Sequence, residues 1–154
     1  MTFTRYAIYY APPAEAAWSK WATDWLGWDM EAGCATVLPD AGALDVAAIT
    51  ATPRKYGLHA TIKPPFVLAE GTTADGLLAE FEALCTRLSP VTLDGLALTP
   101  LGRFLALTPE GDTAALNAMA AEVVRGLDAF RAPPAEADLA RRRQANLTPA
   151  QEAN

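Results

Sequence analysis

The chain has 154 residues, 51% of them hydrophobic, which suits a folded domain with a buried core and excludes a disordered segment. Its 12 basic and 18 acidic residues give a formal net charge of −6. That balance excludes broad, sequence-independent binding of nucleic acid, which needs a basic face. It allows a small phosphate-bearing substrate held by one local cation.

Hydropathy and cysteine usage predict the compartment. No stretch approaches the roughly 18 consecutive apolar residues of a membrane span, and the N-terminus lacks a cationic segment followed by a long apolar run. We therefore expect a cytoplasmic protein without membrane contact. The two cysteines, Cys34 and Cys85, are far apart and form no zinc-binding pattern, so we expect no metal site and buried, unpaired thiols.

The N-terminal part of the chain begins with a predicted strand and a predicted helix. Residues 5–11 are rich in β-formers and predict a strand that ends at Pro12. Residues 14–27 predict an amphipathic helix, because three tryptophans recur at helical spacing. A tryptophan stripe can be a ligand-stacking surface, but core packing is the commoner role and is our interpretation. The stripe consists of Trp18, Trp21 and Trp25.

The middle of the chain predicts a short helix, a strand and a longer helix. Residues 29–53 are irregular except for a short helix within 43–50, capped by Asp45. Residues 56–63 predict a second strand, which the next two prolines end. A second helix is predicted over residues 74–88, where apolar side chains again recur at helical spacing.

A hairpin, a third helix and a linker complete the pattern. Residues 91–98 and 103–107 flank a Thr-Pro-Leu-Gly turn and predict the hairpin, and residues 113–130 predict the helix. Residues 131–138 are typical of a linker. The order of elements favours an α+β fold, with a small, mainly antiparallel sheet and helices packed on one of its faces.

The last residues carry a helix-start pattern. Thr148 is a good N-cap, Pro149 suits the first helical position and Gln151 completes a capping box. A helix of one turn has no stability of its own, so these residues are either a frayed tail or the start of a helix that is missing. We favour the second interpretation, in which the chain is a fragment. The expected division is a first lobe over 1–132, and a linker with the start of a missing part over 133–154.

The only histidine, His59, lies in the second predicted strand. Because side chains alternate across a strand, His59, Thr61 and Lys63 point one way and the apolar residues between them point the other. We expect the apolar side to face the helices and the polar side to line the open face of the sheet. An imidazole, a hydroxyl and an ammonium in a row suit a phosphate. Spacing alone nevertheless favours the competing interpretation of a solvated histidine.

Five stretches, in order along the chain, resemble a known protein family. An H-x-T triplet on the second strand of an α+β chain resembles the two-histidine (2H) phosphoesterase superfamily. The whole set is similar to one branch of it, domain of unknown function family 1045, which is often encoded beside phosphonate-utilisation genes. The stretches are RYAIYYAPP, WSKWATDWLGWD, PRKYGLHATIKPPF, LGRFLALTP and RRRQANLTPAQEA.

The resemblance implies two similar α+β lobes that face each other across a cleft, each with one H-x-T strand. One histidine would act as general base and the other as general acid on a phosphodiester, usually cyclic, without a metal or other cofactor. His59 and Thr61 match the first motif as catalytic residues. Lys63, Tyr56 and Arg54 match the branch's local pattern as candidate substrate-binding residues.

The chain departs from that pattern because it contains no second histidine and so no second H-x-T motif. The chain resembles a first lobe plus a linker, in agreement with the helix-start pattern at its end. A lone lobe would also expose apolar surface, and we expect self-association through it.

Other arginines are weaker candidates. Arg103 follows the hairpin turn and is a further candidate for substrate binding, although a solvated strand edge is the commoner role. The run Arg141–Arg143 can bind an anion, but we interpret it as a solvated face.

Three hypotheses remain at this point. The first is a phosphoesterase of small cyclic phosphodiesters, complete only in a longer polypeptide. The second is a non-catalytic module that binds phosphate or a nucleotide. The third is an accessory protein of phosphonate metabolism.

Overall fold

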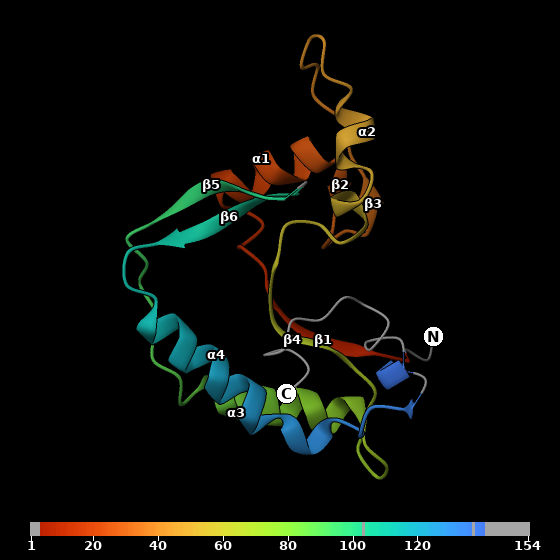
Figure 1. Cartoon of the computed structure of the whole chain (residues 1–154), viewed down its shortest axis with the longest axis vertical. Coiled ribbons are helices and arrows are strands. Elements are labelled where there is room, and N and C mark those ends of the chain that lie inside the picture. Colours follow the sequence, from red (N-terminus) through yellow and green to blue (C-terminus); the bar gives the residue numbers. More distant parts are fainter. Residues whose placement is uncertain (1–3, 103, 137, 141–154) are drawn as a thin grey trace. The chain divides into compact units, whose positions relative to one another are not determined.

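The computed structural model of the chain describes residues 4–102, 104–136 and 138–140. Its residues group into two compact units. The central unit comprises Ala7–Pro64, and the terminal unit comprises the described residues on either side of that range. Helices and short strands alternate along the chain, which confirms the α+β class (Figure 1). Over the described residues, the strands form three two-stranded sheets instead of the one expected sheet.

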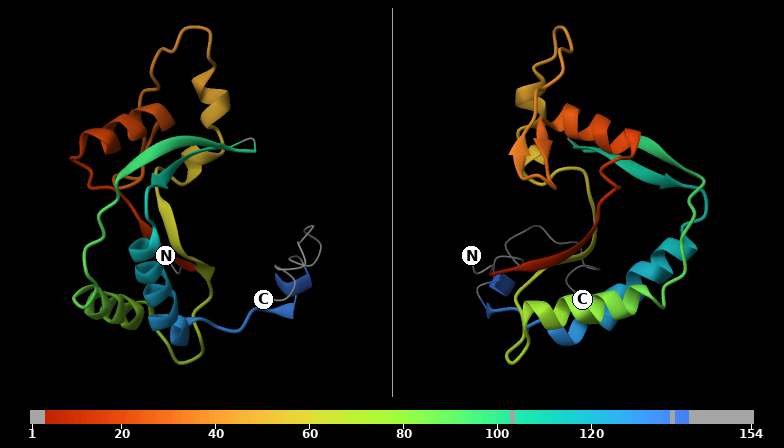
Figure 2. Two further views of the ribbon diagram at one scale, coloured as in Figure 1. Left: turned by 60° about the vertical axis from the view of Figure 1, so that its left-hand side comes forward. Right: turned by 180° about the vertical axis from the view of Figure 1, so that it is seen from behind.

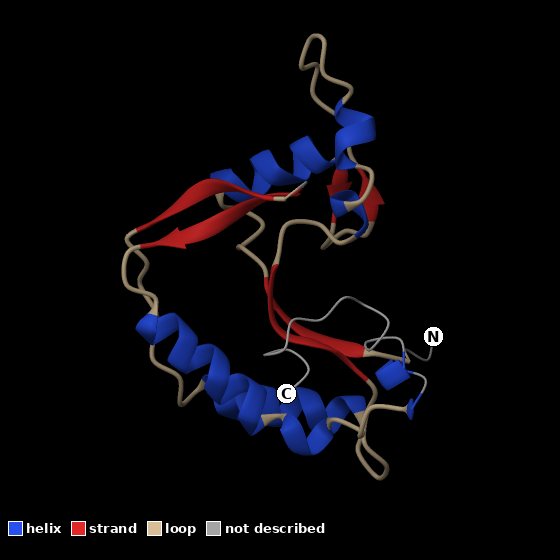
Figure 3. Ribbon diagram, viewed as in Figure 1, coloured by secondary structure: helices blue, strands red, loops and turns tan. Residues whose placement is uncertain are grey.

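Strands β1 (Tyr6–Tyr10) and β4 (Ala60–Phe66) pair with each other (Figure 3). The first strand is where the sequence predicts it. The second begins four residues later than expected and continues through Pro64 and Pro65, so the prediction that these prolines end it is wrong. A strand in a two-stranded sheet has one unpaired edge, and a proline whose missing N–H falls on that edge removes no ladder hydrogen bond.

Helix α1 (Ala17–Leu26) confirms the first predicted helix. It ends at Gly27, whose left-handed φ of 69° lets its N–H reach the carbonyls of the last turn. The predicted core role of the tryptophan stripe is wrong, because Trp21 is 61% exposed. Trp21 instead stacks on Trp25, with ring centroids 5.7 Å apart. The buried side of the helix carries Ala22 and Leu26.

The rest of the central unit is built from short elements. Strands β2 (Trp28–Asp29) and β3 (Cys34–Ala35) form an antiparallel hairpin that the sequence did not predict, since two-residue strands carry no alternation. Helix α2 (Val46–Thr50) is the predicted short helix, and Asp45 caps it by accepting a hydrogen bond from the Ala48 amide. A 3₁₀ turn, η1 (Pro53–Lys55), follows.

In the terminal unit, helices α3 (Ala74–Cys85) and α4 (Ala114–Gly126) lie side by side (Figure 2). Both confirm predicted helices. Thr73 caps α3, Asp112 accepts a hydrogen bond from the first amide of α4, and a 3₁₀ turn, η2 (Asp128–Phe130), follows α4. Within the ranges that the structure describes, no helix is long and apolar enough to cross a membrane.

The core of the terminal unit lies between these two helices. A Cβ added at Gly126 would lie 3.2 Å from Leu84 Cδ2, so the absent side chain of Gly126 lets the helices approach closely. The buried residues of α3, of α4 and of the position directly after α4 are Leu77, Leu84, Val123 and Leu127. Cys85 and Cys34 are both exposed, so the prediction of buried thiols is wrong.

Strands β5 (Gly95–Leu101) and β6 (Phe104–Glu110) form the predicted hairpin, with Leu98 opposite Leu107. The turn is tighter than expected, because Leu101 already pairs with Phe104. Alternation gives the hairpin one face on which every side chain is apolar and exposed. That face consists of Leu96, Leu98, Pro100, Leu105, Leu107 and Pro109.

Leu84→Ala tests this division between core and exposed leucines. Leu84 is only 2% exposed, so removing its buried methyl groups is expected to lower the free energy of unfolding by about 2–5 kcal/mol. Leu98→Ala is the matched control, since Leu98 is 67% exposed and its loss should change stability by less than about 0.5 kcal/mol. Denaturant unfolding measures both, and equal losses would contradict the assignment.

Candidate functional site

His59 lies directly before β4 and is half-buried. Its Nδ1 is 3.0 Å from the carbonyl oxygen of Gly57. A carbonyl oxygen only accepts hydrogen bonds, so Nδ1 is the donor in this contact and carries the proton. In the neutral ring the lone pair then belongs to Nε2, which is the nitrogen able to take a proton from a reacting group.

The turn before His59 depends on Gly57. This residue is buried and has a φ of 69°, in the region that favours glycine. A Cβ at this position would lie 2.9 Å from Met30 Cβ, closer than real Cβ atoms approach. The carbonyl that holds Nδ1 is therefore set by a position at which only glycine fits.

Two tyrosines flank the imidazole. Tyr9, on β1, has its ring centroid 4.1 Å from that of His59 with an interplanar angle of 31°. Tyr56 is farther, with centroids 6.2 Å apart, and is exposed. The structure thus brings the predicted residues Tyr56 and His59 together. Tyr9 was missed, because only the pairing of β1 with β4 brings it next to a residue so distant in the sequence.

The other polar residues of β4 differ in exposure. Thr61 is exposed, so its hydroxyl is open to solvent. Lys63 is 2% exposed, and the prediction that it lines an open face of the sheet is wrong. Alternation fixes the side of a strand to which a side chain points, but burial depends on what packs over that side. His59 directly precedes β4 and Thr61 is its second residue, so the two are separated by Ala60 alone.

Arg54 links the helices of the central unit. Its Nε donates a 2.7 Å hydrogen bond to the carbonyl of Leu26, the last residue of α1. Its Nη2 donates to Thr50 Oγ1 at 2.7 Å and to the Ala47 carbonyl at 3.2 Å, both in α2. A guanidinium at helix C-termini also meets the negative end of the helix dipole. The geometry gives this predicted binding residue a role in holding α1 and α2 together.

Other basic candidates fall outside the part of the chain that the structure describes. These are Arg103 and the run Arg141–Arg143. The predicted helix start at Thr148 also lies outside the described residues. The predicted division after residue 132 is not tested and stays a prediction. Among the described residues, no group of three or more histidine, cysteine or acidic side chains lies close enough to hold a metal ion.

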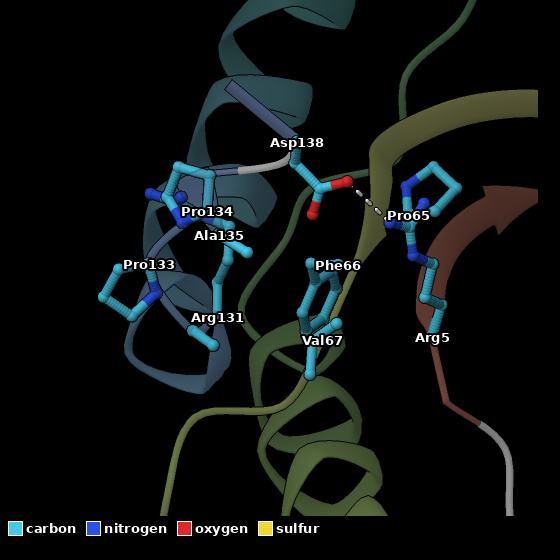
Figure 4. A pocket seen from close by; sticks show the side chains of 10 residues that line it. Arg5, Pro65, Phe66, Val67, Arg131, Pro133, Pro134, Ala135 and Asp138 are labelled. Atoms are coloured by element: carbon cyan, nitrogen blue, oxygen red, sulfur yellow. Dashed lines mark hydrogen bonds and ion pairs between the residues drawn. The ribbon is translucent and has the colours of Figure 1, made fainter. Parts of the chain in front are cut away.

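Each unit has a cavity. In the central unit a cavity of about 520 Å³ is lined by α1 residues, by the β2–β3 hairpin and by Leu58. In the terminal unit a cavity of about 470 Å³ lies beside the end of β4, and the ion pair of Arg5 with Asp138, 3.2 Å long, borders it (Figure 4). Arg131 also lines this second cavity. Its guanidinium donates hydrogen bonds to the Asp128 carboxylate, and this pairing raises the pKa of Arg131. His59 lines neither of these two cavities.

Comparison with known families gives a match to the family described as "Protein of unknown function (DUF1045)" over residues 61–154. That range is more than half of the chain. The chain belongs to this family. The matched range begins at Thr61, so it includes Lys63, α3 and α4 but starts just after His59.

Two curated proteins are similar to the chain. One, from Janthinobacterium sp. (strain Marseille), is 35% identical over 99% of this chain, and another, from Laribacter hongkongensis (strain HLHK9), is 34% identical over 84% of it. Both carry the name "Ribose 1,5-bisphosphate phosphokinase PhnN". The chain spans only about a third of their length, 34% and 31% respectively. No solved structure matches the chain.

Arg54→Lys tests the linking role of the guanidinium. A lysine keeps the charge but cannot donate to both helices through a planar fork, so the free energy of unfolding is expected to fall by about 1.5–3 kcal/mol. Lys55→Gln, at the exposed neighbouring position, is the control and should stay within about 0.5 kcal/mol of wild type. Urea unfolding of the three proteins gives the comparison, and an unchanged midpoint for Arg54→Lys would exclude this role.

Proposed function

We propose that this chain is the part of a 2H-type phosphoesterase that carries the first catalytic histidine, acting on a small cyclic phosphodiester. The observation that supports the proposal is the hydrogen bond from His59 Nδ1 to the Gly57 carbonyl. It leaves Nε2 as the proton acceptor of the neutral ring, as a general base requires. The H-x-T triplet supports the same assignment.

Thr61 is the second catalytic residue of the proposal. Its exposed hydroxyl, two residues after His59, donates a hydrogen bond to a phosphoryl oxygen and stabilises the charge that develops there. Tyr56, exposed and next to the imidazole, contacts the non-reacting part of the substrate. Lys63 and Arg54 do not contact the substrate in this proposal. Lys63 is buried, and the Arg54 guanidinium is hydrogen-bonded to helix carbonyls.

The reaction needs a second proton-transfer group. Hydrolysis of a cyclic phosphodiester adds water to phosphorus and breaks one P–O bond, so one group takes a proton from water while another donates one to the leaving oxygen. The 154 residues contain a single histidine. In this proposal the second histidine lies outside these residues, and the relatives, about three times as long as the matched region, have room for it.

The relatives' name supports the substrate class. It refers to a ribose bisphosphate, a sugar phosphate whose neighbouring hydroxyls can form cyclic esters. We propose a ribose-based cyclic phosphate, formed in phosphonate metabolism or as a 2′,3′-cyclic phosphate. The net charge of −6 favours such a small substrate over a polynucleotide.

His59→Asn tests the assignment in the longest natural polypeptide that carries this chain. Loss of one acid–base group is expected to lower kcat about 100- to 10,000-fold on a ribose cyclic phosphate or a nucleoside 2′,3′-cyclic phosphate. Thr61→Val should lower kcat by about 10- to 1,000-fold, as for loss of one donor to a developing oxyanion. Thr52→Val is the control, because Thr52 is exposed and makes no side-chain cap bond. Full activity in His59→Asn would refute the catalytic role.

A binding module without turnover is the second candidate, and the single histidine favours it for the chain alone. In that case the 154-residue chain is stabilised by inorganic phosphate or a ribose phosphate, and Thr61→Val removes part of the stabilisation. Thermal unfolding at ligand concentrations about 100 times the dissociation constant should show about 2.7 kcal/mol of added stability. An equal shift in wild type and Thr61→Val would exclude Thr61 from the binding site.

A further inference from the structure

Tyr9 has no role in the proposed reaction, yet its ring makes the closest aromatic contact of His59. The two ring centroids are 4.1 Å apart and tilted by 31°, a partly stacked arrangement. Both residues belong to the central unit, Tyr9 on β1 and His59 directly before β4. The pairing of these two strands brings the rings together.

The imidazole is therefore constrained in two independent ways. The hydrogen bond from Nδ1 to the Gly57 carbonyl holds one edge of the ring. The tyrosine ring covers one face and so restricts rotation of the ring plane. A hydrogen bond alone would not prevent rotation of a half-exposed imidazole, because after rotation water accepts a hydrogen bond from Nδ1 at little net cost in free energy. Contact on the face makes that rotation unfavourable.

We propose that Tyr9 is a positioning residue that keeps the neutral His59 imidazole in the form protonated on Nδ1. Nε2 then stays unprotonated at the opposite edge of the ring, away from the Gly57 carbonyl. This tautomer is the reverse of the one that predominates in free histidine. The contact is between rings, so the phenol hydroxyl is not required. Only the use of Nε2 on a substrate rests on the proposed function.

The tautomer can be measured directly because the chain has one histidine. In protein with ¹⁵N-labelled histidine, at alkaline pH, we expect the nitrogen shifts of wild type to show a protonated Nδ1 and an unprotonated Nε2. Tyr9→Phe should give the same spectrum. Tyr9→Leu should shift the tautomer ratio toward protonated Nε2 by roughly 2- to 10-fold, the population equivalent of one aromatic pair.

Tyr10→Leu is the matched control, since Tyr10 is the next residue of β1 and points to the opposite side of the strand. It should leave the histidine shifts unchanged. If Tyr9→Leu does not fold, Tyr9→Met keeps the side-chain volume without a ring and serves the same comparison. A wild-type spectrum with protonated Nε2, or identical spectra for wild type and the ring-free variant, would overturn the proposal.

Kinetics separate this inference from the proposed function. If both hold, Tyr9→Leu lowers kcat of the full-length enzyme in proportion to the fraction of His59 that stays protonated on Nδ1, because only that fraction reacts, while KM changes little. Tyr9→Phe restores kcat. If His59→Asn keeps full activity while the tautomer shifts as expected, the catalytic role of His59 fails and the positioning role of Tyr9 stands.

Discussion

The pairing of β1 with β4 is the interaction on which the candidate site depends. It brings Tyr9 against the face of His59, although fifty residues separate them in the chain. A second constraint is local, since the left-handed turn at Gly57 directs a carbonyl toward Nδ1 of the imidazole. Together these two contacts hold one face and one edge of the half-buried imidazole.

The basic residues show how differently one residue type can be used in neighbouring segments. Arg54 was a candidate for binding phosphate, but its guanidinium joins the last carbonyl of α1 to α2. Lys63 is buried in a strand whose other polar member, Thr61, is exposed. A phosphate bound next to His59 would therefore meet hydroxyl and aromatic groups first.

The β5–β6 hairpin exposes an apolar face. Four leucines and two prolines lie exposed on one side of a two-stranded sheet, an unusual arrangement for a finished surface. The curated relatives are about three times as long as the region they share with this chain. A longer polypeptide or a second copy of the chain would bury such a face.

By itself the sequence determined the α+β class, the positions of α1, α3 and α4 and the hairpin, because periodicity, caps and turn residues act within a few residues of each other. It also identified His59 and Thr61 as the residues to test. Only the tertiary structure decided that Trp21 is exposed, that Lys63 is buried and that Tyr9 covers the imidazole. Burial and long-range ring contacts depend on which elements pack together, and no local pattern records that choice.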